Sequence, residues 1–257
     1  MDTAVARRWT ALVLLVSAAL TLAGLTAAPV AAADDAKIYV VQGLPGRTVD
    51  VAVDGKTVAE GVKTAAVTKA FPVKAGSRKV TFSDDGDVLL ERMFKVGAGS
   101  SWDVVLHLPA DGGADAEPAV TVFRNDLSDV PRGKASLTVA HTARVGDADV
   151  RVDGKVLFAD IENGESLNLV VPVATYEVAI VPAGKSSPVV LGPVDLTVQG
   201  GALNRVYAIG DPAKKTMNVA VHVIETGSTG SEKPSRVDTG TGGQAVGLQR
   251  PETALWS

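Results

Sequence analysis

The chain contains nearly the same phrase twice. Residues 51–56 read Val-Ala-Val-Asp-Gly-Lys, and residues 150–155, which begin 99 positions later, read Val-Arg-Val-Asp-Gly-Lys. Self-similarity at a fixed period indicates a duplicated structural unit, so we expect two copies of one domain. Each phrase places an Asp-Gly pair between two runs of strand-forming residues. Because such a pair supplies the two positive-φ residues of a two-residue hairpin turn, Asp54-Gly55 and Asp153-Gly154 are predicted to be turns.

Short runs rich in Val, Thr and Ile recur along the chain, separated by Gly, Pro and Asp about every 8 to 12 residues, a spacing typical of an all-β sandwich or barrel. In the first copy we expect strands at 37–42, 48–53, 56–59, 66–73, 78–83, 88–95, 101–108 and 119–124. In the second copy we expect them at 136–141, 148–152, 155–159, 166–171, 175–181, 194–198, 203–209 and 217–224.

The predicted organisation follows from these runs. It is a signal peptide at 1–33, a β-sandwich at 34–126, a linker at 127–134, a second β-sandwich at 135–226 and a tail at 227–257. The tail is rich in Gly, Ser and Thr and keeps no apolar period, so it is expected to be disordered. The linker is too short to be a free tether, and we expect the sandwiches to sit end to end with limited swing.

The first 33 residues have the pattern of an export signal. Arg7 and Arg8 precede an unbroken apolar and small-residue run at 11–26, and Ala31-Ala32-Ala33 carries the small residues that a signal peptidase accepts. We expect cleavage between Ala33 and Asp34 and a secreted, extracellular protein with no retained membrane span. The residues after the arginine pair, Trp9 and Thr10, favour the general secretory route, and twin-arginine export remains the alternative.

Composition narrows the classes of partner. The chain has no Cys, which excludes disulfides, lipoprotein anchoring and thiolate metal sites. Removing the signal, with its two Arg and one Asp, takes the net charge from −4 to −5. Nucleic acid and anionic lipid both call for a clustered basic face, so neither is an expected partner. Without disulfides the domains depend on their cores for stability, unless Lys–Asn isopeptide bonds take the place of the disulfides. The intact mass of the protein tests that alternative.

No catalytic, metal or cofactor constellation emerges. His107, His141 and His222 all fall inside expected strands without the paired spacing of a zinc site, so each is expected to be a partly buried histidine with its hydrogen bonds satisfied. The cluster Asp84-Asp85-Gly86-Asp87 is expected to be a turn, because calcium requires six to eight converging oxygens. Residues 240–245 match a dinucleotide fingerprint but lie in the tail with no following helix. The protein is therefore expected to bind no cofactor and not to be an enzyme.

Aromatic residues make up 4% of the chain and fall mostly in or beside expected strands, where rings usually fill a core. Sugar-binding modules instead stack sugars on exposed rings. Trp102 has no counterpart in the second copy and is the ring to check for exposure.

The leading hypothesis is a secreted, non-enzymatic cell-envelope or interaction protein whose partner is a cell-wall polymer or an envelope protein. The alternative is a glycan-binding or accessory module of a secreted hydrolytic system.

Two stretches carry a resemblance to a known family. Residues 49–56 followed by Phe71-Pro72-Val73-Lys74-Ala75-Gly76, and residues 148–155 followed by 171–178, resemble bacterial domain-of-unknown-function family 4397. The resemblance implies two tandem immunoglobulin-like β-sandwiches and an extracytoplasmic location. It supplies no functional residues. The Ala-rich signal and the Gly-Thr-Gly-Gly tail resemble exported proteins of high-GC actinobacteria.

Overall fold

The computed structural model describes residues 34–111 and 116–229, and this part of the chain is all-β. The first copy contains β1 (Ala36–Gln42), β2 (Thr48–Val53), β3 (Lys56–Lys63), β4 (Phe71–Val73), β5 (Gly76–Asp84), β6 (Asp87–Val96), β7 (Ser101–His107) and β8 (Ala119–Arg124). The second contains β10 (Lys134–Ala143), β11 (Ala148–Val152), β12 (Lys155–Ile161), β13 (Ser166–Pro172), β14 (Thr175–Pro182), β15 (Leu191–Thr197), β16 (Ala202–Gly210) and β17 (Asn218–Glu225).

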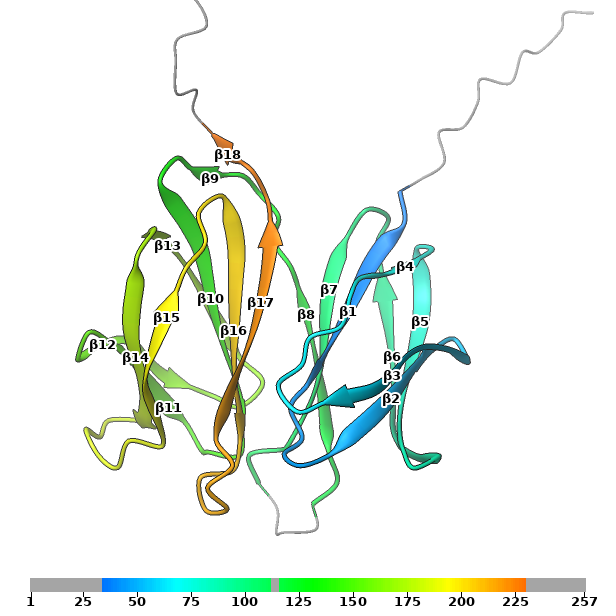
Figure 1. Cartoon of the computed structure of the whole chain (residues 1–257), viewed down its shortest axis with the longest axis horizontal. Helices are drawn as coiled ribbons and strands as arrows, with labels where there is room; N and C mark the ends of the chain where they lie inside the picture. Colours follow the sequence, from blue (N-terminus) through cyan, green and yellow to red (C-terminus); the bar gives the residue numbers. More distant parts are fainter. Residues whose placement is uncertain (1–33, 112–115, 230–257) are drawn as a thin grey trace, which may run out of the picture. The chain divides into compact units, whose positions relative to one another are not determined.

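Each copy consists of two four-stranded sheets with the same strand order (Figure 1). The outer sheets have the orders β3-β2-β5-β6 and β12-β11-β14-β15. The inner sheets have the orders β4-β1-β7-β8 and β13-β10-β16-β17. The inner sheets are mixed, because β1 pairs with β7 and β10 with β16 in parallel. The sequence repeat is thus accompanied by a repeated topology.

The core of each copy is built from strands along which buried and more exposed side chains alternate. Along β2 the residues Val49, Val51 and Val53 are buried while those between them are more exposed, and they pack against Ile38 and Val40 of the inner sheet. A period of two places every second residue on one face, so a strand that alternates in this way buries one face only. The second copy has its own core of the same kind, between its outer and inner sheets.

The repeated Asp-Gly pairs connect β2 to β3 and β11 to β12. Both residues of each pair have positive φ: 50° at Asp54, 82° at Gly55, 49° at Asp153 and 75° at Gly154. Each aspartate also binds the neighbouring strand, because its Oδ1 accepts a hydrogen bond from the backbone N–H of Lys79 (2.9 Å) in β5 or Glu177 (3.1 Å) in β14. The turn residue therefore ties three strands of its sheet together.

The chain between and after the copies contains a pairing that the sequence does not predict. β9 (Val130–Pro131) lies in the expected linker and β18 (Ser228–Thr229) in the expected tail, and the two pair in parallel. The end of the second copy is thereby bonded to the segment that enters it. The remaining tail residues and the dinucleotide-like motif at 240–245 lie outside the described residues, as does the signal peptide.

The expected strand at 66–73 is shorter in the structure. Regular pairing is limited to β4, and Val67 makes a single bridge to Val41. Pro72 within β4 has no N–H to donate, which suits its position in the edge strand of the inner sheet.

The two copies contact each other through the faces of their inner sheets, and not end to end as expected. Both copies belong to one compact unit of the chain. Their inner sheets bury a third apolar cluster, here called the junction, formed by Val41, Val105, Phe123, Ala140, Tyr207, Ile209 and Ala220. Each inner sheet is therefore covered on both faces, by its own outer sheet and by the other copy.

Candidate functional site

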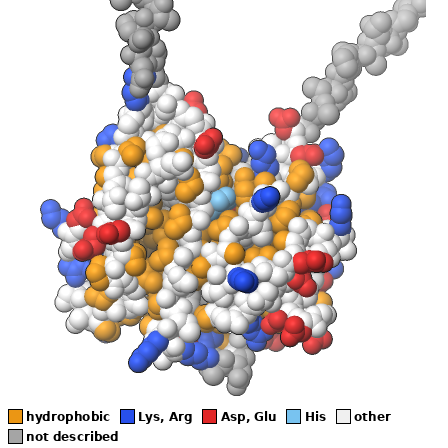
Figure 2. All heavy atoms as spheres, viewed as in Figure 1, with side chains coloured by type: hydrophobic (Ala, Val, Ile, Leu, Met, Phe, Trp, Pro, Cys, Tyr) orange, Lys and Arg blue, Asp and Glu red, His pale blue; other side chains and the backbone are white. Residues whose placement is uncertain are grey.

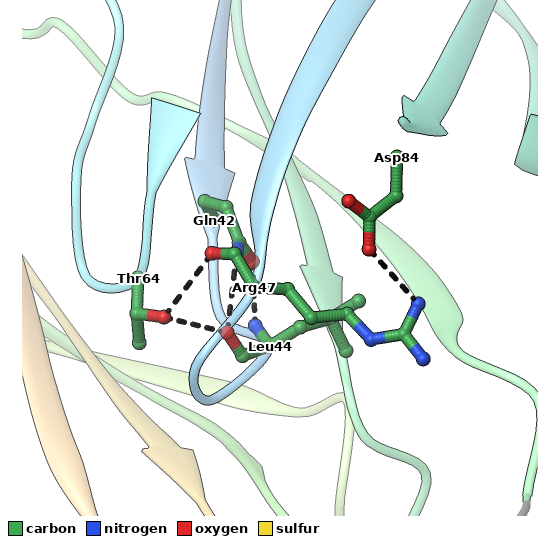
Figure 3. A network of polar contacts seen from close by, with 5 residues as sticks. All are labelled: Gln42, Leu44, Arg47, Thr64 and Asp84. Atoms are coloured by element: carbon green, nitrogen blue, oxygen red, sulfur yellow. Dashed lines mark hydrogen bonds and ion pairs between the residues drawn. The ribbon is translucent and has the colours of Figure 1, made fainter. Parts of the chain in front are cut away.

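A buried polar group at the end of the first strand holds the following loop in each copy. In copy one Gln42 donates to the carbonyl oxygens of Leu44 (3.1 Å) and Arg47 (2.8 Å) and accepts from the Leu44 N–H (2.6 Å), as Figure 3 shows. His141 stands 99 residues later, and its Nε2 lies 3.2 and 3.1 Å from the carbonyl oxygens of Val145 and Gly146. His141 is therefore a loop-holding residue, equivalent to Gln42 of copy one.

A second buried polar group crosses the junction. Asp103 of β7 is fully buried, and its Oδ2 accepts a short hydrogen bond from the Tyr207 hydroxyl and lies 2.9 Å from Nδ1 of His222. Its Oδ1 accepts from Nδ2 of Asn125 at 2.8 Å. The His222 ring also contacts the ring of Tyr39, with 4.3 Å between centroids. One carboxylate of copy one thus binds two strands of copy two.

Burial changes the acid–base properties of these groups. Burial, and next the Asp103 carboxylate, raise the pKa of Tyr207 well above its usual range, although Arg205 opposes the shift. The pKa of Tyr39 is raised by burial and then by the charge of Asp103. Burial lowers the pKa of His107 to about 4 and lowers that of His141. Both tyrosines therefore stay protonated, and His107 stays neutral at pH 7.

The Asp103 cluster is built to hold the copies together. A histidine that activates a nucleophile carries an aspartate on one ring nitrogen and a hydroxyl or thiol on the other. In the described part of the chain His222 bonds Asp103 through Nδ1, and its ring packs on Tyr39. His107 bonds the Leu108 carbonyl oxygen and the Thr121 hydroxyl, each at 2.9 Å. Each histidine of the sequence thus has a structural role.

A mainly apolar cavity lies between the two sheets of copy two and is here called the copy-two cavity. Its volume is about 410 Å³. Except for Asp195 and Asn218, its lining is glycine or aliphatic: Val139, Val178, Ile180, Val190, Leu191, Gly192, Val194, Leu196, Val206, Ala208, Met217, Val219 and Val221. In Figure 2 hydrophobic side chains gather over the half of the molecule that carries β15 and β17. Cavities of this size and lining are typical of ligand sites.

The cavity follows from smaller side chains at repeated positions. In the outer sheet of copy one, Phe82 pairs with Val51. The residue 99 positions after Val51 is Val150 of copy two, and it pairs with Ile180. Ile180 is therefore the equivalent of Phe82. In the inner sheet of copy one, Leu106 pairs with Gln42. His141 stands 99 positions after Gln42 and pairs with Ala208, so Ala208 is the equivalent of Leu106. Phe82 and Leu106 fill the core of copy one, whereas Ile180 and Ala208 line the cavity.

The residues singled out in the sequence lie elsewhere. Trp102 is half-buried against the core of copy one, its ring 6.0 Å from that of Phe94 and its Nε1 donating to the Ser100 hydroxyl at 2.7 Å. Asp85 and Gly86 form the turn between β5 and β6, with φ of 50° and 91°. Within residues 34–111 and 116–229, no three His, Asp or Glu side chains lie close enough to hold a metal ion.

At the expected signal cleavage point, Ala33 lies outside the described residues. Asp34 is described, and its carbonyl oxygen accepts a hydrogen bond from the Gly99 N–H at 2.9 Å. No helix in the described part of the chain has the length and hydropathy needed to cross a membrane.

Comparison with known proteins gives one result. The family model described as a domain of unknown function (DUF4397) matches residues 36–151, which include all of copy one, β9, β10 and most of β11. The match is a single one, so the prediction that both copies are members of this family is not confirmed. No curated protein matches the chain.

Proposed function

We propose that the protein is a secreted, non-enzymatic cell-envelope or extracellular interaction protein that binds its partner through copy two. The observation that carries the proposal is the copy-two cavity, which opens between the edge strands β15 and β17. Because Phe82 and Leu106 fill the corresponding core positions of copy one, the space that could accept a ligand group at these positions is particular to copy two. The export signal expected at residues 1–33 supports the location.

The surface of copy two supports the same assignment. Twelve large hydrophobic residues of the described chain are well exposed, and nine of them belong to copy two: Val156, Leu157, Leu167, Val170, Val173, Val189, Val194, Val221 and Val223. Monomeric proteins rarely expose large contiguous apolar patches outside interaction sites. Val194 and Val221 also line the cavity, so the exposed surface continues into it.

The expected occupant is an unbranched aliphatic chain carried by an envelope component. The lining contains no aromatic ring on which a sugar could stack, and copy one fills the equivalent space with hydrocarbon side chains. Trp102, the ring that a glycan-binding function would use, packs on the core of copy one, which counts against that alternative. Non-enzymatic function is supported by the structural hydrogen bonds of all three histidines.

Fractionation of the native producer tests this proposal. We expect the wild-type protein in the cell-wall fraction, and a variant with Ala208→Leu, which fills the cavity as Leu106 does in copy one, in the medium. Met93→Ala, at a residue of copy one that is 67% exposed, is the matched control and should be retained like the wild type. Retention of the Ala208→Leu protein, or free release of the wild type, would contradict the proposal.

A further inference from the structure

A polar cavity of about 370 Å³, here called the linker cavity, lies where the end of copy one, the linker and copy two meet. Arg124, Asp126 and Ser128 line it from copy one and the linker. Ser136, Thr138, Asn168 and Arg205 line it from the inner sheet of copy two. The linker cavity is separate from the copy-two cavity, and an inference drawn from it does not depend on the proposed function.

Arg205 is a buried cation with unused donors. It is 5% exposed, its Nη2 donates to the Arg124 carbonyl oxygen at 3.1 Å, and its guanidinium lies 5.4 Å from the centre of the Phe123 ring. Its Nε and Nη1 are buried and make no hydrogen bond of ordinary geometry, and the guanidinium also interacts with the Tyr207 hydroxyl. Asp103, the buried carboxylate that crosses the junction, already accepts bonds from Tyr207, His222 and Asn125.

A second unused polar group stands beside Arg205. Thr138 is directly across from Arg205 on β10, and Asn168 is directly across from Thr138 on β13. Thr138 is 1% exposed and its Oγ1 has no hydrogen-bond partner. Buried donors without partners are costly, and most in folded proteins are satisfied by protein, water or a ligand.

From this arrangement we propose that the linker cavity binds the carboxylate group of a small monoanionic ligand, with Arg205 and Thr138 as its donors. A guanidinium presents parallel N–H groups that match the two oxygens of a carboxylate. The lining contains two arginines, Arg124 and Arg205, and two aspartates, Asp126 and Asp129. Because these charges cancel, a single negative charge fits the cavity better than the double charge of phosphate or sulfate.

Titration of the full mature chain with sodium acetate, at constant ionic strength set with sodium chloride, tests the proposal. The readouts are the Tm and the NMR signal of the Arg205 Nε–H group. For the wild type we expect a saturable rise in Tm and a saturable shift of that signal, since a ligand that binds only the folded state stabilises it. Sodium sulfate at equal ionic strength should give a smaller effect.

Two variants and one control complete the experiment. Arg205→Gln should abolish the acetate-dependent rise in Tm. Thr138→Val, which keeps the side-chain shape, should weaken acetate binding about tenfold, as expected for one lost hydrogen bond. Arg151→Gln, at an arginine whose Nε is also unpartnered but which lies outside the linker cavity, should respond like the wild type.

Each result of these titrations either supports or contradicts a carboxylate site in the linker cavity. If acetate has no saturable effect on the wild type, or if Thr138→Val responds like the wild type, the linker cavity holds only water and the proposal is wrong. If sulfate binds as well as acetate, the site is a general anion site and the assignment to a carboxylate is wrong. Because Thr138→Val removes no charge, it gives this answer even where Arg205→Gln does not fold.

Discussion

Among single residues, Asp103 of copy one is bonded to Tyr207 and His222 of copy two. Asp103 accepts three hydrogen bonds, two of them from copy two. Hydrogen bonds to a buried charged group contribute more than neutral ones, and removing one partner leaves the others unsatisfied. The junction should therefore depend strongly on this one side chain.

Asp103→Asn should lower the free energy of unfolding by about 3 kcal/mol, because the amide cannot accept from Tyr207, His222 and Asn125 together. Urea denaturation monitored by circular dichroism measures the change. Asp87→Asn, at an exposed residue, is the control and should stay within about 0.5 kcal/mol of the wild type. A wild-type stability for Asp103→Asn would show that the cluster contributes little to the junction.

His107 predicts a dependence of stability on pH. Its pKa is lowered to about 4 in the folded protein, mainly by burial, from an ordinary value of 6.5. The unfolded chain therefore binds a proton that the folded protein does not, and stability is lost as the pH falls from about 6.5 to about 4, by at most about 3 kcal/mol. His141, lowered in the same direction, should add to this loss.

Urea denaturation of the wild type and His107→Gln at pH 7, 6, 5 and 4 checks this prediction. The stability of the variant should fall less steeply with decreasing pH than that of the wild type. Equal slopes for the two proteins would mean that His107 gains its proton in the folded state at an ordinary pH.

At the scale of elements, much of the strand pattern is predictable from the sequence. The strands at 48–53, 119–124 and 148–152 have the predicted bounds, because alternation and turn residues are local signals. The pairing of β9 with β18 and the contact of the inner sheets join residues about 100 positions apart, which no local period reports. One usable signal exists: the second half of β16, Val206-Tyr207-Ala208-Ile209-Gly210, has no charged residue, and the strand is buried throughout, as expected for a strand covered on both faces.

The candidate cavity could not be predicted in the same way. Ile180 and Ala208 are ordinary core residues by type, and only the pairing with β11 and β10 shows that they replace Phe82 and Leu106. Similarly, Asp103 and Arg205 are polar residues in strands, and the sequence does not say that their face of the sheet is covered by the other copy.

Exchanging the side chains of Leu106 and Ala208 between the copies should change the free energy of unfolding in opposite directions. Ala208→Leu should raise the free energy of unfolding by about 0.5–2 kcal/mol, because it fills an existing cavity. Leu106→Ala should lower it by about 2–5 kcal/mol, because it opens a filled core. Urea denaturation of both variants measures the two effects. Destabilisation by Ala208→Leu would indicate that the cavity cannot accept the added side chain.

At the scale of the whole molecule, the junction should make the two copies unfold together. They share an apolar cluster and a buried carboxylate, and β9 pairs with β18 across the ends of copy two. Calorimetry of the mature chain should show one transition whose calorimetric and van't Hoff enthalpies agree. Two resolved transitions in the wild-type protein would mean that the junction is too weak to couple the copies.

Methyl NMR of the mature protein titrated with 1-hexanol, a short unbranched aliphatic chain, asks directly whether copy two is the binding copy. The methyl signals of Ile180, Leu191 and Val219, which line the copy-two cavity, should shift saturably, while those of Val104 and Leu106 in copy one stay unchanged. The shifts should disappear in Ala208→Leu. Unchanged cavity signals in the wild type, or equal shifts in both copies, would contradict the assignment of copy two as the binding copy.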